Sequence, residues 1–231
     1  MDYRTFKLIL VLFISIFLTA FSHIRNNKRN VNFDDIQFFE SPMKFISLDS
    51  VNKLLKQIKQ DTSTHVKRDL NLYETILSNN QIIEKADLSI DIENRMFVSI
   101  KERNPVLRFI NKDSYLDDSG KLMPLSKKFT ERIPIIIGTI NEQYFKKLGF
   151  IGNFIKNDSF LKNHISGLKM DDKFLVFYVN NKSFKLKMDF FNDVKKKFFN
   201  YKVFYKSVSD SVLNTYSMIN LNFKNQIIAK K

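Results

Sequence analysis

The longest run of apolar residues lies near the start of the chain, from Leu8 to Ile24. Its 17 residues carry no charge, and Lys7 and Arg25 bracket it. A helix of this length covers roughly 25 Å, close to the hydrocarbon thickness of a thin bilayer. The pattern therefore predicts one membrane-spanning helix over residues 8–24, after a short tail (residues 1–7) and before a polar linker (residues 25–31).

A cleavable signal peptide is the alternative for this segment. Arg4 and Lys7 provide a basic start, and Ala20-Phe21-Ser22 loosely matches a cleavage site. The apolar run is long for a signal peptide, so we expect the helix to be retained as an anchor. Basic residues flank the run on both sides, so charge leaves its orientation open.

Two amphipathic helices are predicted after the linker. Apolar residues recur at helical spacing from Ile46 to Gln60, and again from Asn71, where Asn71 and Glu74 resemble a capping box. Ser78-Asn79-Asn80 ends the second helix. The predicted buried positions on the two helices are Val51, Leu54, Leu55, Ile58, Leu72, Tyr73, Ile76 and Leu77.

A clear strand pair follows these helices. Ala86, Leu88, Ile90 and Ile92 alternate with polar residues, as do Met96, Val98 and Ile100 after a turn at residues 93–95. With a strand predicted from Phe33 to Phe39, the order is strand, helix, helix, strand, strand. Residues 32–103 are therefore predicted to form a small α+β domain with both helices on one face of a three-stranded sheet.

The pattern becomes richer in strands beyond Pro105, so residues 104–231 are predicted to form a second, strand-rich domain. Pro134 suggests an edge strand or a strand start, and Gly149 and Gly152 weaken one predicted helix. In the other helix the predicted buried residues are Phe191, Val194, Phe198 and Phe199, and Lys195-Lys196-Lys197 form a solvated face. The predicted elements are strands at 106–110, 114–116, 122–125, 133–138, 174–179, 183–188 and 219–223, helices at 141–156 and 191–204, and a last extended segment at 226–229.

Composition narrows the function without identifying it. The net charge is +14, but the 38 Lys and Arg are spread along the chain beside abundant Asn, Ile and Phe. This mixture is typical of an A/T-rich genome, so we predict no nucleic-acid partner. The chain has no Cys, which excludes disulfides, thiol catalysis and Cys-ligated metal.

Catalytic residues are not predicted. The three histidines, His23, His65 and His164, do not fall in a metal-like or triad-like pattern, and no Gly-rich loop is present to hold phosphate. The acidic pairs Asp34-Asp35, Asp117-Asp118 and Asp171-Asp172 lie at predicted turns or strand starts, where Asp commonly binds backbone N–H groups. We therefore predict a non-enzymatic protein with no cofactor, metal or small-molecule substrate.

The C-terminal strand is a candidate binding surface. A final strand at a sheet edge leaves N–H and C=O groups unpaired, which a partner strand can complete. Lys230-Lys231 could instead guard the edge against such pairing. The sequence leaves these two alternatives open.

The order of these parts and several short motifs resemble the cell-division protein FtsQ (DivIB) family, in particular its Bacteroidetes form. The likeness covers nearly the whole chain. The residues that carry it are Ala86-Asp87-Leu88, the segment 98–108 (VSIKERNPVLR), the segment 115–125 (YLDDSGKLMPL), the segment 132–138 (RIPIIIG) and the segment 219–227 (INLNFKNQI).

The resemblance implies a single-pass inner-membrane protein with a cytoplasmic N-terminus, located at the division septum. Its periplasmic part would comprise a POTRA domain (residues 32–103) and a β domain (residues 104–231). It would recruit FtsB- and FtsL-like proteins and, through them, the peptidoglycan synthase pair FtsW and FtsI. The FtsB contact would use strand addition at the last strand, which corresponds here to Asn225, Gln226, Ile227, Ile228, Ala229 and Lys230.

The runner-up prediction is a POTRA-bearing factor for outer-membrane protein assembly or secretion. Such a factor would bind unfolded client strands instead of fixed division partners. A hydrolase with an atypical carboxylate site is a more distant alternative, which Asp-to-Asn substitutions would test.

Overall fold

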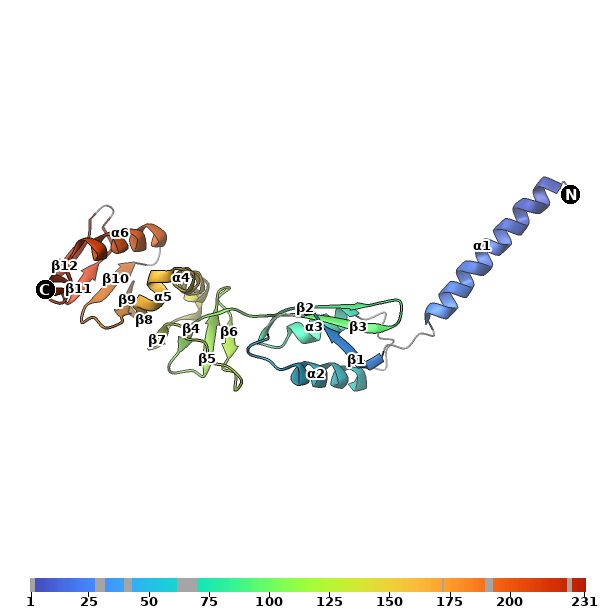
Figure 1. Cartoon of the computed structure of the whole chain (residues 1–231), viewed down its shortest axis with the longest axis horizontal. Helices are drawn as coiled ribbons and strands as arrows, with labels where there is room; N and C mark the ends of the chain where they lie inside the picture. Colours follow the sequence, from blue (N-terminus) through green and yellow to red (C-terminus); the bar gives the residue numbers. More distant parts are fainter. Residues whose placement is uncertain are drawn as a thin grey trace. The chain divides into compact units, whose positions relative to one another are not determined.

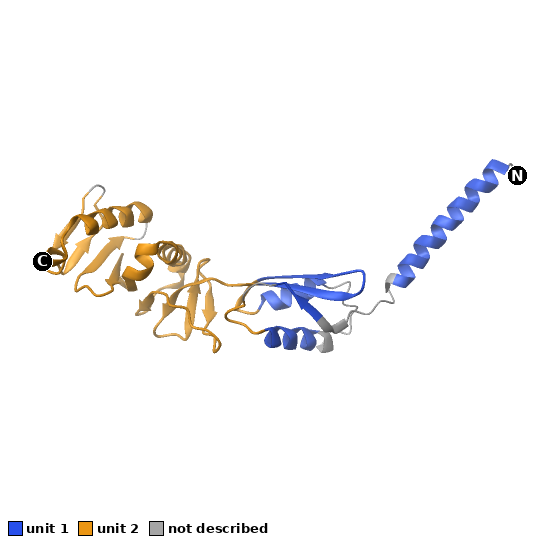
Figure 2. Ribbon diagram, viewed as in Figure 1, with its two compact units in different colours: residues 1–42, 48–79, 85–100 blue, residues 43–47, 80–84, 101–231 orange. Residues whose placement is uncertain are grey.

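The computed structural model describes seven stretches of the chain (Figure 1), namely residues 3–27, 32–39, 43–61, 70–171, 173–189, 193–223 and 226–231. The chain divides into two compact units (Figure 2). The first comprises residues 1–42, 48–79 and 85–100, and the second comprises residues 43–47, 80–84 and 101–231. The predicted domain boundary at Arg103 and Asn104 stays a prediction.

Helix α1 (Tyr3–Asn27) is the apolar segment at the N-terminus. Its portion Tyr3–Arg25 contains an 18-residue stretch with a mean hydropathy of 2.2 and is long and apolar enough to cross a bilayer. The helix extends beyond the predicted residues 8–24 at both ends, because Lys7 and Arg25 can be helical while their charged ends reach toward water. The predicted linker is therefore wrong at residues 25–27, and its residues 28–31 lie outside the described residues.

The first unit contains a three-stranded sheet and two helices. Strand β3 (Arg95–Glu102) lies between β1 (Asn32–Phe38), which is parallel to it, and β2 (Ile83–Ile90). Helices α2 (Leu48–Asp61) and α3 (Leu70–Ser78) contact each other. Buried and more exposed residues alternate along β3, so one face of the sheet is covered. The predicted α+β order of these five elements is confirmed.

The predicted cap of α3 is wrong. Asn71 already lies inside the helix. The Glu74 carboxylate instead accepts a hydrogen bond from the backbone N–H of Leu88 in β2, at 2.7 Å. Glu74 therefore joins helix to sheet.

Three residues predicted to be buried in this unit are exposed. Leu72 and Ile76 lie on the outer side of α3, and only Tyr73 and Leu77 of the predicted stripe are buried. Ile92 is 83% exposed because β2 ends at Ile90 and the chain turns. The Asp91 carboxylate accepts hydrogen bonds from the N–H groups of Glu93 and Arg95, which fixes this turn.

The second unit is built on a nine-stranded sheet with the order β12-β11-β10-β9-β8-β7-β4-β5-β6. Seven of the strands lie within two residues, at each end, of a segment that was predicted to be extended. The strands are β4 (Pro105–Phe109), β5 (Ser114–Asp117), β6 (Leu122–Pro124), β7 (Ile135–Ile137), β8 (Ile165–Asp171), β9 (Phe174–Val179), β10 (Lys185–Asp189), β11 (Met218–Asn220) and β12 (Ile228–Lys230).

Strand β7 lies inside the sheet, parallel to both β4 and β8. The prediction of an edge strand is therefore wrong, and the prediction of a strand start is correct. Pro134 precedes the strand, where its missing N–H costs no ladder bond. Its carbonyl accepts a hydrogen bond from the N–H of Arg108 at 3.0 Å.

Helices cover one face of this sheet (Figure 1). They are α4 (Phe145–Asn157), which follows the short 3₁₀ helix η1 (Glu142–Tyr144), and α6 (Val194–Ser207). The residues below them form a row that crosses five strands and has no exposed surface. This row consists of Ile219, Leu186, Phe177, Leu168 and Ile136.

Two glycines allow α4 to lie close to the sheet. A Cβ atom on Gly149 would lie 2.7 Å from the carbonyl oxygen of Asp117. A Cβ atom on Gly152 would lie 2.8 Å from the side chains of Val106 and Leu107. The glycines that weakened the helix prediction are thus required by packing, which the helical pattern alone does not show.

Helix α6 differs from its predicted form. It begins at Val194, and the predicted core residue Phe191 lies outside the described residues. Phe199 was predicted to be buried but is 61% exposed. Lys197, predicted to be solvated, is buried and its Nζ lies 2.8 Å from Asp189 Oδ1. The buried face follows the helical spacing of Val194, Phe198 and Tyr201, which places Phe199 on the outer side.

Three elements of the second unit were not predicted. They are β8 and the short helices α5 (Ser159–His164) and α7 (Asp210–Leu213). Helix α5 has too few residues for a helical period to appear. Its start is fixed by Asp158, whose carboxylate accepts hydrogen bonds from the N–H groups of Phe160 and Leu161.

Candidate functional site

Strand β12 is one edge of the nine-stranded sheet. It pairs antiparallel with β11, with Ile219 opposite Ala229 and Asn220 opposite Ile228. In the strand order nothing follows β12 on its other side. An edge strand presents backbone N–H and C=O groups that a further strand can bind. The predicted binding strand is therefore at an edge among the described residues.

The predicted partner-binding residues fall partly inside this strand. Ile228, Ala229 and Lys230 form β12, whereas Gln226 and Ile227 precede it. Asn225 lies outside the described residues. Ile228 is 44% exposed and Lys230 is exposed, while Ala229 packs against the core.

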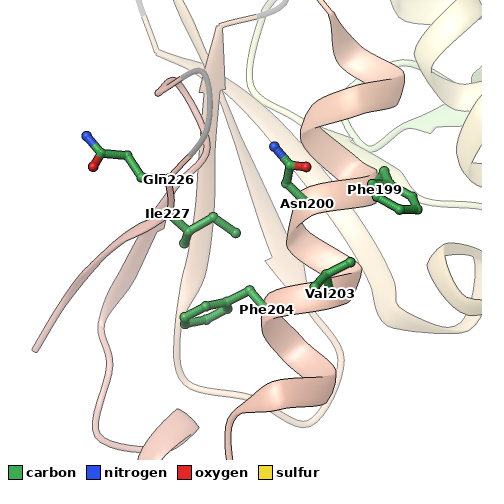
Figure 3. A pocket seen from close by; sticks show the side chains of 6 residues that line it. All are labelled: Phe199, Asn200, Val203, Phe204, Gln226 and Ile227. Atoms are coloured by element: carbon green, nitrogen blue, oxygen red, sulfur yellow. The ribbon is translucent and has the colours of Figure 1, made fainter.

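A groove of about 380 Å³ lies between α6 and the segment that leads into β12 (Figure 3). Ile227 points toward α6, where Asn200 and Phe204 face it (Figure 3). Phe199 and Val203 also line the groove and are 61% and 54% exposed. The edge strand therefore adjoins a groove of mixed polar and apolar lining that can receive side chains of a partner.

Phe199 and Val203 form a second apolar stripe on α6. They are four residues apart and so share one helix face, away from the buried stripe. They also line a second hollow, on the side of Phe160 and Lys202. The sequence signal for this surface was available, because Phe198 and Phe199 cannot both lie on one narrow face, but the prediction placed both in the core.

A buried hydrogen bond holds α6 in place. His164 Nε2 lies 2.6 Å from the Tyr201 hydroxyl, and both side chains are buried. Burial lowers the pKa of His164 to about 4, with a smaller contribution from the Lys182 charge. Burial also raises the pKa of Tyr201. His164 is therefore neutral at pH 7 and part of the framework of the groove.

An ion pair ties the outer side of α6 to α5. Lys202 Nζ lies 2.5 Å from Asp158 Oδ2, the carboxylate that also caps α5. This pair lowers the pKa of Asp158 against the opposing effect of burial. The helix that lines the groove is thus fixed on its inner and outer sides.

The acidic pair Asp117-Asp118 binds neighbouring groups of the fold. Asp117 is buried, and its carboxylate accepts hydrogen bonds from Ser119 N, Lys121 N and Arg103. Asp118 accepts one from the Asn104 amide. Asp172 and the side chains of Asp34 and Asp35 lie outside the described residues. Within the described part of the chain, no group of three or more His, Asp or Glu residues could hold a metal ion.

The chain was compared with solved structures, curated proteins and protein families. No curated protein matches the chain. A solved structure of the major extracytoplasmic domain of the trans isomer of the bacterial cell division protein DivIB from Geobacillus stearothermophilus matches with 10% identity and a TM-score of 0.32. That match covers 39% of this chain and 81% of the other.

A family model described as FtsQ/DivIB, C-terminal related, matches residues 104–230. This range holds the whole nine-stranded sheet and the candidate edge strand. It comprises 127 of the 231 residues, which is more than half of the chain. The chain therefore belongs to the FtsQ/DivIB family of cell-division proteins.

Proposed function

We propose that this chain is a non-enzymatic connector of the bacterial division machinery, held in the inner membrane by α1. Family membership supports the role in cell division. The apolar helix Tyr3–Arg25 fits a single-pass anchor, and we propose that it is retained. The N-terminus would be cytoplasmic, and the chain after α1 would be periplasmic, at the septum.

The proposed partners are FtsB- and FtsL-like division proteins, which would link the chain indirectly to FtsW and FtsI. An FtsB-like partner would add a strand to β12. The observation that carries this proposal is the position of β12 at the end of the sheet, beside a groove lined by both apolar and amide side chains. Backbone pairing would provide affinity, and side chains entering the groove would provide specificity.

Deletion of residues 226–231 is the direct test of this site. We expect the full chain without these residues to lose binding to an FtsB-like protein in a pull-down. Ile228→Pro should weaken binding by about ten-fold or more, because proline lacks the N–H donor and restricts φ. Ile228→Ala is the matched control, since it keeps the N–H and should bind more tightly than Ile228→Pro.

Circular dichroism and thermal unfolding must accompany the pull-down. The expected result is a deletion variant that stays folded and does not bind. Retained binding by the folded deletion variant would contradict strand addition at β12, while leaving the membership of the family untouched.

Depletion in cells separates this function from outer-membrane assembly. A connector of the division machinery predicts filamentous, undivided cells. Loss of outer-membrane proteins without filamentation would favour the assembly factor instead. Co-purification from membranes, with partners identified by mass spectrometry, tests the partner list directly.

A further inference from the structure

The nine-stranded sheet has a second face, opposite the helices α4 and α6. Successive residues of a strand point to opposite faces, so the neighbours of the buried row point away from the helices. Three examples are Lys185 beside Leu186, Tyr178 beside Phe177 and Ile137 beside Ile136. We call this the outer face.

Cations gather on the outer face. Lys185 lies opposite both Met218 and Tyr178, and Lys187 lies opposite both Asn220 and Val176. The same rows continue to Lys230, Lys169 and Arg108 on other strands. The five cations of the outer face are thus Lys230, Lys185, Lys187, Lys169 and Arg108.

These five cations have no carboxylate partner among the described residues, unlike Lys197 and Lys202 of α6. The ammonium of Lys185 lies 5.2 Å from the ring centre of Tyr178, and that of Lys187 lies 4.1 Å from the ring centre of Phe174. Asp171 lies on this face, in one row with Phe174 and Asp189. Asp189 ends its strand and its carboxylate pairs with Lys197 of α6, on the helix side of the sheet. The outer face therefore keeps a net positive charge.

Apolar side chains lie between the cations, and Phe174, Val176 and Tyr178 occupy three successive outer-face positions of β9. Ile135 and Ile137 are exposed on β7, and Ile228 is exposed on β12. Neighbouring strands are about 4.8 Å apart, so the six steps from β12 to β4 extend the basic rows over roughly 29 Å. Lys185 and Lys187 lie directly beside the β9 side chains, whereas the centre of a protein interface is usually depleted of charged residues.

We propose that the outer face docks on a membrane surface rich in anionic phospholipid. Lysine ammonium groups and tyrosine rings both favour the headgroup layer, where apolar stems enter the boundary and polar ends stay in water. Each basic residue near such a surface contributes about a five-fold increase in binding. The chain's own apolar helix keeps lipid at high effective concentration, so weak docking is sufficient.

Docking has a consequence for the edge strand. Lys230 and Ile228 belong both to β12 and to the outer face. The docked state therefore holds the β12 edge at the lipid surface. This inference does not depend on a partner strand, so it can fail or succeed separately from the proposed function.

The absence of cysteine allows a clean test with the full chain. Ile137→Cys and Val203→Cys each introduce one label site, at 36% and 54% exposure, on the outer face and the helix side respectively. Each variant is labelled with an environment-sensitive fluorophore and reconstituted into vesicles of phosphatidylcholine alone or with phosphatidylglycerol. We expect the label at position 137 to brighten and shift to the blue only with phosphatidylglycerol, and the label at position 203 not to respond.

Charge variants then identify the lysines responsible. The equilibrium constant for docking should fall by about 100-fold in the triple variant Lys169→Gln, Lys185→Gln and Lys187→Gln. The matched control is Lys195→Gln, Lys196→Gln and Lys206→Gln, which removes the same charge from exposed positions of α6 and should change nothing. Circular dichroism checks the fold of both triples. Equal fluorescence signals in the two kinds of vesicle would overturn the proposal and favour an acidic protein as the occupant. An equal loss of docking in both triple variants would also overturn it.

Discussion

The two ends of the nine-stranded sheet differ in how far the rest of the chain covers their side chains. At the β6 end, the side chains of Met123 and Tyr115 are buried beneath Phe45, which belongs to the separate segment 43–47. At the β12 end, the strand has one neighbour and Ile228 remains exposed. Both β6 and β12 are terminal strands. The chain covers side chains at the β6 end with its own segment and leaves Ile228 exposed at the β12 end, where a partner strand could add to the sheet.

The cover at the β6 end is fastened by polar groups. The Glu102 carboxylate accepts hydrogen bonds from the backbone N–H groups of Lys44, Phe45 and Ile46, at 2.7 to 2.8 Å. The Ser126 hydroxyl donates to the carbonyl of Phe45 at 2.6 Å. Three amides on one carboxylate form a charge-assisted network that fixes segment 43–47.

The largest expected effect comes from opening the covered end. Glu102→Ala leaves three amides without their carboxylate and should cost about 4 kcal/mol of stability. Denaturation of the detergent-solubilised full chain measures the loss, and hydrogen exchange should become faster at residues 44–46. Binding of an FtsB-like protein at the other end should persist, and if Glu102→Ala abolished that binding, the two ends would not be independent.

A somewhat smaller effect is expected on acidification, at the bond that holds α6, the helix beside the β12 segment. His164 has a pKa of about 4 in the folded chain and an ordinary value near 6.5 when unfolded. Between these values the unfolded state binds more protons, so stability is complete above pH 6.5 and falls as the pH drops toward 4. The loss should be about 3 kcal/mol.

The variant His164→Gln separates this histidine from the carboxylates that also titrate in acid. Unfolding free energies of both proteins are compared from pH 7 to pH 4. The part of the slope that disappears in His164→Gln belongs to His164. Identical slopes would show that the bond to Tyr201 does not make stability depend on pH.

The smallest expected effect tests whether the groove beside β12 contributes to partner binding. Phe199→Ser should weaken binding of an FtsB-like protein about ten-fold, because a half-exposed aromatic side chain is a common binding hot spot. Stability should change by less than about 0.5 kcal/mol, since the residue lies outside the core. Phe150→Ser provides the control, because Phe150 is a comparably exposed phenylalanine on α4 outside the groove lining. Equal affinities for the two variants would remove the groove from the binding site.

Much of the fold follows from local patterns. The bounds of β9 were predicted without error, and turn residues such as Asn94 and Asn181 adopt the positive φ values that such turns require. The errors occur where periodicity cannot separate two faces of one helix. Phe199 was predicted to be buried and is exposed, whereas Lys197 was predicted to be solvated and is buried. The prediction relied on hydrophobicity alone and did not include the position of the sheet below α6.

The candidate site was predicted only in outline. The sequence indicated a final strand with unpaired groups, and its family resemblance located that strand near residues 225–230. The strand that was expected to run from Ile219 to Phe223 is shorter and lies inside the sheet as β11, with β12 outside it. The groove with Phe199 and Val203 was missed.

The sequence by itself determined the apolar anchor, the α+β order of the first unit and most strands of the second, because each depends on spacing along the chain. Only the tertiary structure decided which strand is the free edge, which face of α6 is open and why Gly149 must be glycine. Those properties depend on residues far apart in sequence, such as Glu102 with Phe45 and Gly149 with Asp117. The order of the strands and the close approach of α4 to the sheet both depend on contacts between residues far apart in sequence, which local patterns do not contain.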